Sequence, residues 1–418
     1  MIQLLFFCPC LFLRENFPKS RALYGRLGAF LGDDLLTFSH GPEGPWKANR
    51  TLINPAFKSS SLRAMSPTFA QQAIKFTQRL LAHAYAHPEV SLNFSAELDK
   101  LTLNIISLAG FGFDVGTYHG LTETSPFLSA LQTVLSQATS PLFLLPYGGQ
   151  LARFLQRRNF RAINEVFYNV IDRRIQEGLE GKRDSERVAD LLDAMLKPGD
   201  DGRQLTREEL RNELLLFYLA GHDTTANVLN WALLELARHP DVHATVMDEI
   251  DSVMGPAEKD PNNVVCPTHA QLEEMPYLEM VLKETLRLYP AAPSVFRMVP
   301  ETFEFKGMVY PKGISLSTSV FLIHRDPELW PEPEKFDPER FTKDNCANRH
   351  TFAFLPFSAG PRICIGKNFF YLESKILLVT LLRSLKFEVD VSQEPTRMTR
   401  SKGLLKATSN WLKVSSIR

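Results

Sequence analysis

Cysteine is scarce in this chain of 418 residues, with five at positions 8, 10, 266, 346 and 364. An odd and low number in a chain of this size argues against a disulfide framework. Cys8 and Cys10 are separated by one residue, which is not the spacing of a zinc site, and no matching second pair follows them. The sequence therefore gives no support to a disulfide-stabilised scaffold or to structural zinc.

An excess of positive charge is also lacking. Lys and Arg together number 47 and Asp and Glu together number 47, so the formal net charge is +0. Non-specific nucleic-acid binding depends on surplus Lys and Arg that displace counterions. We therefore expect no nucleic-acid partner.

Long apolar runs are missing as well. The apolar N-terminal stretch ends at Leu13 and contains Gln3 and Pro9, whereas a transmembrane helix needs about 20 apolar residues. No positively charged region precedes it, as a signal peptide would require. Residues 1–13 are predicted to be a short apolar segment: an anchor remnant, a membrane-surface contact or an artefact of the start of the chain.

Phenylalanine is abundant, with 30 residues against 10 Tyr and 4 Trp. Hydrophobic residues make up 44% and charged residues 22%, as in globular proteins. Such a chain can bury a large apolar interior and an apolar ligand within it.

The periodicity of apolar residues predicts mainly helices, and no repeats are found. A capping box at Thr206–Glu209 opens a helix from about 210 to 238. The expected fold class is mainly α, a helix-rich single domain with small β-sheets. Further helices are predicted over 241–254, 276–290 and 366–385, and strands over 314–320 and 385–391.

The common motifs of phosphate, zinc-peptidase and hydrolase chemistry are absent, since there is no P-loop, HExxH or GxSxG. The most informative stretch is Phe357–Gly366, FSAGPRICIG, just before a predicted helix. A thiolate is a strong axial ligand for haem iron, and the helix N-terminus beside Cys364 is expected to lower the pKa of its thiol. Gly360 permits a backbone conformation closed to other residues, and Gly366 permits close approach to a flat macrocycle. Arg362 can pair with a haem propionate.

This stretch resembles the cysteine-ligand loop of the cytochrome P450 family, FxxGxRxCxG, at every fixed position from Phe357 onward. Glu284-Thr-Leu-Arg287 is similar to the family's ExxR, and Pro338–Phe341 is similar to its PERF element. The resemblance implies that Arg340 joins Glu284 and Arg287 in a buried, structural charge network. Breaking such a network costs about 3–5 kcal/mol.

The stretch Ala220–Thr225, AGHDTT, resembles the family's oxygen-activation motif, AGxDT. The resemblance implies a local break of the helix over the iron, where Gly221 makes room for dioxygen. Thr224 would stabilise the bound oxygen and Asp223 would feed it protons. The alternative is a solvent-facing polar patch in which the threonine bonds to its own helix.

Two further patterns concern the haem edges and the substrate. Trp46-x-x-x-Arg50 resembles the WxxxR of the family's C helix, which supplies donors suited to a propionate, and Arg297 matches another propionate-binding position. Apolar residues fall where the family's substrate contacts lie: Phe217, Ala220, Pro293, Val295 and Phe296.

The resemblance spans about residues 14–418 as one catalytic domain of the eukaryotic microsomal type. It implies a monooxygenase in which haem b, ligated by the Cys364 thiolate, inserts one oxygen atom of dioxygen into a small apolar, lipid- or sterol-like substrate. It also implies an NADPH-dependent flavin reductase as electron donor and a location on the cytosolic face of the endoplasmic reticulum membrane. Basic residues that could dock the reductase are Lys47, Lys58, Arg63, Arg349 and Lys367.

The chain starts where the family's B helix would be, after the anchor, the A helix and the first β1 strands. We therefore expect an incomplete sheet with an uncovered edge near residues 314–320 and a partly open substrate entrance. Two alternatives stay open. One is a haem-thiolate isomerase or dehydratase acting on a lipid peroxide, which the intact motifs disfavour. The other is a truncated, haem-poor and inactive family member.

Overall fold

The computed structural model describes residues 17–20, 24–37, 45–114, 126–137, 142, 145, 147–180, 190–257, 263–393, 395–401 and 404–417. The apolar segment predicted over 1–13, with Cys8 and Cys10, lies outside these residues. No helix within the described ranges is long and apolar enough to cross a membrane.

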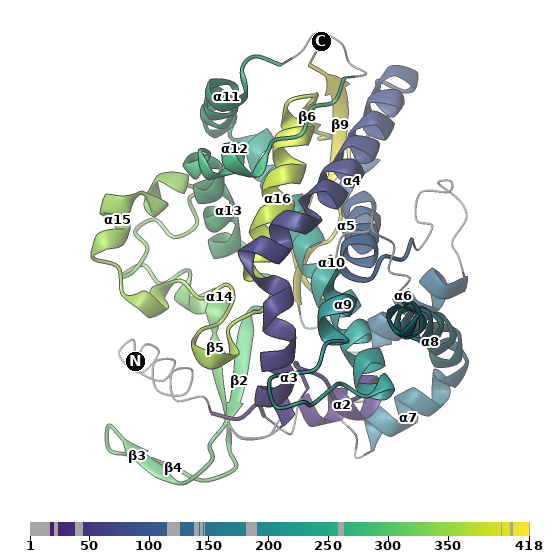
Figure 1. The fold of residues 1–418 in the computed structure, drawn as a ribbon. Helices are drawn as coiled ribbons and strands as arrows, with labels where there is room; N and C mark the ends of the chain where they lie inside the picture. The colour runs from purple at the N-terminus through teal and green to yellow at the C-terminus, as the bar shows by residue number, and fades with distance from the viewer. Residues whose placement is uncertain are drawn as a thin grey trace.

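Helix α10 (Arg207–Arg238) runs through the middle of the molecule (Figure 1). The predicted capping box is confirmed, because the Thr206 side chain accepts from the N–H of Glu209 and the Glu209 side chain accepts from the N–H of Thr206. Every residue from Leu210 to Tyr218 is buried, and so is every residue from Thr225 to Leu236. A helix that is buried on all sides belongs to the core rather than to the surface.

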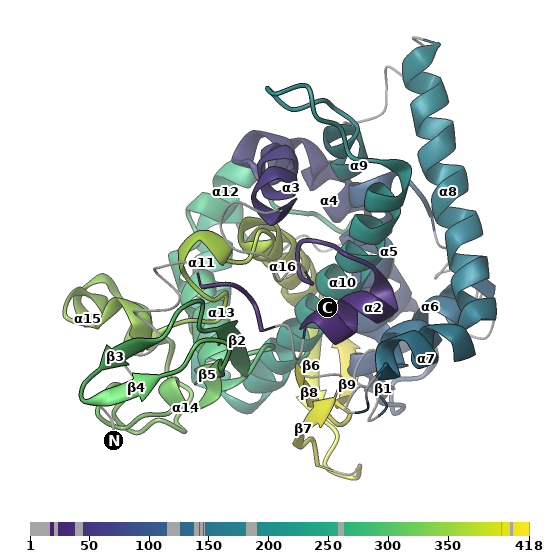
Figure 2. The ribbon, with the colours of Figure 1, turned by 90° about the horizontal axis from the view of Figure 1, so that it is seen from below.

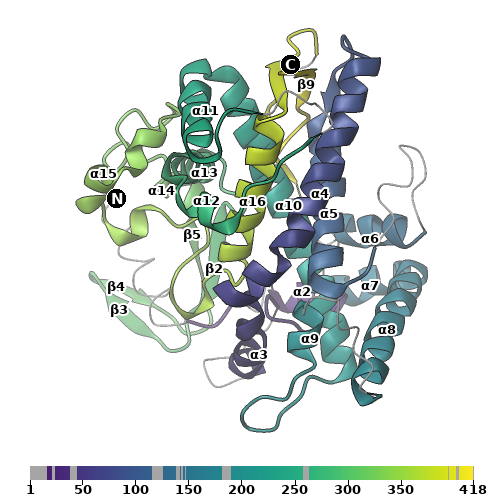
Figure 3. The same cartoon turned by 45° about the horizontal axis from the view of Figure 1, so that its top comes forward.

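Helices α5 (Phe94–Phe111) and α16 (Lys367–Leu382) pack against α10, and α4 (Ser59–Ala86) packs against both of them. Figure 3 shows α4, α5, α10 and α16 running side by side. The remaining helices are α2 (Arg26–Leu31), α3 (Pro45–Ile53), α6 (Pro126–Gln137), α7 (Gly148–Leu155), α8 (Arg157–Leu179), α9 (Leu191–Met195), α11 (Pro240–Met254), α12 (His269–Glu273), α13 (Pro276–Leu288), α14 (Val320–Ile323) and α15 (Lys343–Ala347).

The strands form small antiparallel sheets at the edges of this bundle. Strands β1 (Leu92–Asn93), β9 (Trp411–Ser416) and β6 (Leu385–Val389) make one sheet, in which Leu412 pairs with both Leu92 and Val389. The other sheets have two strands each: β2 (Ser294–Met298) with β5 (Ser315–Ser319), β3 (Phe303–Phe305) with β4 (Met308–Tyr310), and β7 (Met398–Ser401) with β8 (Leu404–Ala407).

The predicted elements are found within a few residues of their expected bounds. The strand expected over 314–320 is β5, and in the described part of the chain its sheet has only β2 as a second strand. The backbone of residues 17–20 lies beside this sheet, since the N–H of Met298 donates to the carbonyl of Pro18 at 2.8 Å. The sheet is therefore small, as expected, while the partly open substrate entrance stays a prediction.

Candidate functional site

Cys364 lies on a tight loop between the 3₁₀ turn Gly360–Arg362 and α16. The N–H of Cys364 donates to the carbonyl of Phe357 at 2.9 Å, which closes the loop. Gly360 has φ of 72°, so its predicted need for a left-handed backbone is confirmed. Ser358 has φ of 62° without being glycine, so this loop holds a strained backbone position.

The pKa of the Cys364 thiol differs from the expectation. Desolvation among the surrounding protein atoms raises it, although the side chain itself borders open space. A hydrogen bond from the backbone of Gly366 and the positive charges of Arg50 and Lys19 lower the pKa of the thiol, but by less than desolvation raises it. The prediction of a lowered pKa is therefore wrong for the protein alone, because burial outweighs the helix terminus. Coordination to a metal deprotonates a thiol outright.

Trp46 and Arg362, which belong to distant motifs, are in contact. The Arg362 guanidinium lies over the indole of Trp46 at 4.1 Å, and both side chains are buried. Arg297 on β2 is also buried, and its Nε has no hydrogen-bond partner among the described residues. Burial followed by the nearby Arg297 charge lowers the pKa of Arg362 to about 10, and burial lowers the pKa of Arg50 and Arg297 as well.

Lys19 is a cation of this site that the motifs did not reveal. It is 8% exposed, and its ammonium donates to the carbonyl of Leu36 at 2.8 Å. Burial, then the charges of Arg297 and Arg362, lowers its pKa to about 7. Asp34 is an acid close enough to oppose these effects. Lys19 lies before the WxxxR motif and belongs to none of the motifs named above, so the sequence did not point to it.

This arrangement fits a haem group. The buried Arg297 guanidinium has no partner for its Nε among the described residues, and Lys19 and Arg362 lie close enough to repel it. Buried cations of this kind require an anion as a partner. Two carboxylates of a propionate-bearing macrocycle would supply that anion. The residues that would hold them are Trp46, Arg50, Arg297, Arg362 and, from the structure, Lys19, while Cys364 presents a thiol from the loop.

The ExxR prediction corresponds to a fully buried pair on α13. Arg287 donates from Nε and Nη2 to the two carboxylate oxygens of Glu284, at 2.7 and 2.8 Å. Its other N–H groups donate to the carbonyls of His324, Pro333 and Lys335. The pair therefore ties α13 to the irregular segment 324–337.

Arg340 completes this network from the turn Pro338–Phe341. Its Nε lies 3.4 Å from an oxygen of Glu284, and its Nη2 donates to the carbonyl of Glu332. The structure thus brings Glu284, Arg287 and Arg340 together as the resemblance implied. Their polar contacts are with backbone groups and with each other, which is the arrangement of a structural brace.

The AGHDTT motif lies on α10, and the predicted local break is not observed, because α10 is one uninterrupted helix from Arg207 to Arg238. Thr224 donates to the carbonyl of Ala220 at 2.7 Å, which satisfies its hydroxyl within the helix. A Cβ at Gly221 would meet Ile106 Cγ1 of α5 at 3.0 Å, so a larger residue there would have to displace the Ile106 side chain. Roles of Gly221 and Thr224 toward dioxygen stay predictions.

Asp223 is buried, at 1% exposure, and its partners come from two elements. Lys406 of β8 places Nζ 2.6 Å from Asp223 Oδ1, and the neighbouring His222 places Nε2 3.4 Å from the same oxygen. The Asp223 carboxylate therefore forms a buried ion pair with Lys406. The sequence carried no signal for Lys406, because it lies 183 positions further along the chain.

The predicted substrate contacts are only partly brought together. Ala220 is exposed in the middle of the otherwise buried α10, so one side of this helix borders open space. Val295 and Phe296 on β2 are half-buried. Phe217 is buried against Phe57 with ring centres 5.6 Å apart, so it belongs to the core rather than to an open pocket wall.

The cytochrome P450 family model matches residues 13–414. The chain belongs to this family. It is 32% identical to Cytochrome P450 3A29 of Sus scrofa, over 91% of this chain and 75% of that protein. It is also 32% identical to Cytochrome P450 4F3 of Homo sapiens, over 96% of this chain and 77% of that protein.

Solved P450 structures share the fold. The crystal structure of the cytochrome P450DA heme domain superposes with a TM-score of 0.81 at 25% identity, covering 98% of this chain and 85% of that one. This P450 is therefore a haem-thiolate monooxygenase, an oxidoreductase whose haem is ligated by cysteine. Its helix-rich architecture with small sheets is that of P450 haem domains.

Proposed function

We propose that this P450, through one catalytic domain from residue 14 onward, inserts an oxygen atom of dioxygen into an apolar, lipid- or sterol-like substrate. The observation that carries the proposal is Ala220, an apolar residue that is exposed within the largely buried α10, three residues before the buried acid Asp223. A site bounded by apolar side chains binds the hydrocarbon part of a ligand through burial of its surface.

Different residues of the site would bind the haem, support the fold around it and handle the proton. When bound through the Cys364 thiolate, haem supplies the activation of dioxygen. Trp46, Arg50, Arg297 and Arg362 would bind and orient the propionates, and the brace around Glu284 holds the segment 324–340 against α13. Thr224 and Asp223 would hold and pass the proton that the reaction consumes.

The first test is the absorption spectrum of the purified protein, reduced and exposed to carbon monoxide. A strongly red-shifted Soret band in the natural protein, lost in Cys364→Ser and kept in Cys346→Ser, supports thiolate ligation by Cys364. Substrate class is then tested by titrating dodecanoic acid and cholesterol and recording the spin-state shift of the ferric Soret band. Absence of haem from the natural protein would contradict the proposal and favour the inactive alternative.

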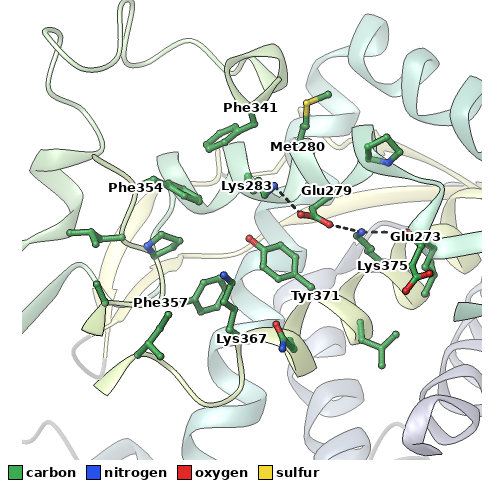
Figure 4. Close-up of a pocket in the computed structure, with 18 of the residues that line it drawn as sticks. Glu273, Glu279, Met280, Lys283, Phe341, Phe354, Phe357, Lys367, Tyr371 and Lys375 are labelled. Carbon is green, nitrogen blue, oxygen red and sulfur yellow. Dashed lines mark hydrogen bonds and ion pairs between the residues drawn. The ribbon is translucent and has the colours of Figure 1, made fainter. Parts of the chain in front are cut away.

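We further propose that an NADPH-dependent flavin reductase docks at the groove beside the Cys364 loop (Figure 4). This groove has a volume of 1090 Å³, and Phe357 and Ile363 of the loop line it. Lys343 and Lys367 also line it, and Lys367 is exposed. An acidic partner would be attracted there by complementary charge.

The other basic residues that were expected to dock the reductase differ in exposure. Lys47, Lys58 and Arg63 are exposed on α3 and around the start of α4. Arg349 instead packs over Trp330 at 4.1 Å and donates to the carbonyl of Arg340, so it serves the fold. We expect Lys367→Glu to slow haem reduction by reductase and NADPH but not by dithionite, whereas Lys312→Glu changes neither. Equal rates in both variants would contradict this docking site.

The proposed location on the endoplasmic reticulum membrane draws support from an exposed apolar face. Leu151, Phe154 and Leu155 of α7 are 45%, 61% and 57% exposed. The next helix, α8, begins with Arg157 and Arg158, whose charge suits anionic headgroups. We expect flotation with phosphatidylcholine–phosphatidylserine vesicles to fall in Phe154→Glu, with Tyr85→Glu on α4 as the control. Unchanged flotation would contradict contact through α7.

A further inference from the structure

Lys406 joins the C-terminal hairpin to the centre of α10. Its Nζ lies 2.6 Å from Asp223 Oδ1, and its side chain is 16% exposed while that of Asp223 is 1% exposed. A charge pair buried to this degree is costly to form, so its geometry must be held by other groups. Figure 2 shows β7 and β8 beside the sheet strands β6 and β9, and β8 packs on α10.

Asn227 supplies that support from the same helix, one turn after Asp223. Its Nδ2 donates to the carbonyl of Leu405 at 2.6 Å, and its Oδ1 accepts from the N–H of Ala407 at 3.3 Å. These two hydrogen bonds fix the backbone of the residues before and after Lys406. One helical turn therefore carries both the acid and the amide that fixes the acid's cationic partner.

A polar cavity of 260 Å³ adjoins the ion pair. Lys406 and Asn227 form part of its wall, together with Asp99, Asn230 and Thr408. A polar cavity of this size can hold several hydrogen-bonded waters. Lys406 thus stands between the buried carboxylate of Asp223 and a space suited to water.

We propose that Lys406 is a positioning residue that holds the Asp223 carboxylate at the inner end of this cavity, where the proton that Asp223 gives up is replaced from water. The inference rests on the proposed proton-delivery role of Asp223. In the replacement, a cavity water passes a proton to the carboxylate while it takes up a proton from bulk solvent, so the water is unchanged. No electron is transferred in this step.

The cationic and titratable groups around Asp223 support this assignment to Lys406. His222 approaches the same carboxylate oxygen, but its Nδ1 is occupied with the carbonyl of Tyr218, and its Nε2 is the more distant at 3.4 Å. Glu373 of α16 is buried near Thr225, and burial raises its pKa well above the usual value, so it favours the neutral form and adds no competing negative charge. Lys406 is therefore the near cation that comes from outside α10.

The test compares variants of the full chain loaded with haem and supplied with NADPH and flavin reductase. The readout is peroxide released per NADPH oxidised, with dodecanoic acid present as an apolar probe; this ratio requires no product to be identified. We expect Lys406→Met to raise the ratio and to lower water-forming turnover by about tenfold. This is less than the roughly hundredfold loss expected at the least for removal of a proton-transfer group itself, because Lys406 acts only through Asp223. The rate of NADPH oxidation and the reduced carbon monoxide spectrum should not change.

Three further variants separate positioning from folding. Lys406→Arg keeps the positive charge and should restore the natural ratio. Lys413→Met removes the cation of an exposed pair between β9 and Glu89, and it should have no effect. Asp223→Asn should raise the ratio by itself, and adding Lys406→Met to it should change nothing more, because both act through one group.

The outcomes separate the positioning role of Lys406 from the proton-delivery role of Asp223. A raised ratio in Asp223→Asn with a natural ratio in Lys406→Met would overturn the role of Lys406 and leave the role of Asp223 intact. A natural ratio in Asp223→Asn would overturn the proton-delivery role and the inference with it. If Lys406→Met loses its haem spectrum, Lys406→Gln is measured in its place, and loss of haem there too would show that Lys406 only maintains the fold.

Discussion

Arg362 and Trp46 are 316 positions apart in the chain, yet the Arg362 guanidinium lies flat over the Trp46 indole at 4.1 Å. An aromatic face attracts a cation without accepting its N–H groups in ordinary hydrogen bonds. The stacking therefore helps to orient the Arg362 guanidinium within the site. The C-helix motif and the Cys364 loop thus depend on each other within one site.

We expect Trp46→Leu to weaken haem retention. Loss of the ring would release Arg362 and remove an indole donor, at a cost of about 1–2 kcal/mol, or roughly tenfold in the rate of haem transfer to apomyoglobin. Trp46→Phe keeps an aromatic face and should show a smaller effect. Equal rates in the natural protein and Trp46→Leu would exclude this stacking from haem binding.

Glu284→Gln should destabilise the protein severely. Both partners of the Glu284–Arg287 pair are 0% exposed, and removing one charge from such a pair costs about 3–5 kcal/mol. The control is Glu388→Gln, which breaks an exposed pair with Lys386 and should cost about 1 kcal/mol or less. Thermal unfolding midpoints measured on both variants check this, and similar midpoints would contradict the bracing role.

His324 should make the protein sensitive to acid. Its neutral ring is fully used, since Nδ1 contacts the carbonyl of Arg287 and Nε2 accepts from the N–H of Leu355. Burial, helped by the charge of Arg287, lowers its pKa to about 3 from an ordinary value of 6.5. The unfolded chain therefore binds the extra proton first, and stability should fall as pH drops from about 6.5 to 3, by about 1.4 kcal/mol per pH unit.

Urea unfolding between pH 8 and pH 4 measures this slope. His324→Asn should be less stable at pH 8 but should lose stability less steeply as the pH falls. His87→Asn, which alters an exposed histidine, should keep the natural slope. A slope that His324→Asn leaves unchanged would assign the acid sensitivity to other groups.

Gly32→Ala should be poorly tolerated for two separable reasons. Gly32 has φ of 111°, and an added Cβ would lie 2.3 Å from Asn212 Oδ1. We expect a cost of about 2–4 kcal/mol from backbone strain and overpacking together. Gly307→Ala, with φ of 74° and open space around it, should cost only about 1 kcal/mol. Equal thermal unfolding midpoints for the two variants would contradict the steric part of this prediction.

Local signals in the sequence predict much of this fold. The capping box at Thr206, Pro276 at the start of α13 and the alternation in β5 each place an element within a few residues. These signals work because each depends on neighbours in the chain. The motifs likewise placed Glu284, Arg287 and Arg340 in one network, since family patterns encode contacts that have no local signature.

Contacts between distant segments without a motif could not be predicted. Lys19 reaches the predicted propionate site from an unpatterned stretch, and Lys406 reaches Asp223 from a short C-terminal strand. The lowered pKa expected for Cys364 was wrong because a helix terminus is visible in sequence, whereas the depth of burial is set by the whole fold. The close approach of Gly221 to Ile106 of α5 is likewise a contact that appears only in the assembled bundle.

The pairing of β9 with β1 has a consequence for biosynthesis. Leu92 and Asn93 find their partners only at Leu412 and Trp411, and Asn227 and Asn230 of α10 bond to Leu405 and Asn410. Because these partners lie far beyond β1 and α10 in the chain, β1 cannot pair and α10 cannot make these bonds until residues 405–412 have been synthesised. Removal of β9 should therefore leave β1 without its strand partner, and we expect such a chain to be retained by chaperones rather than to give a shortened enzyme.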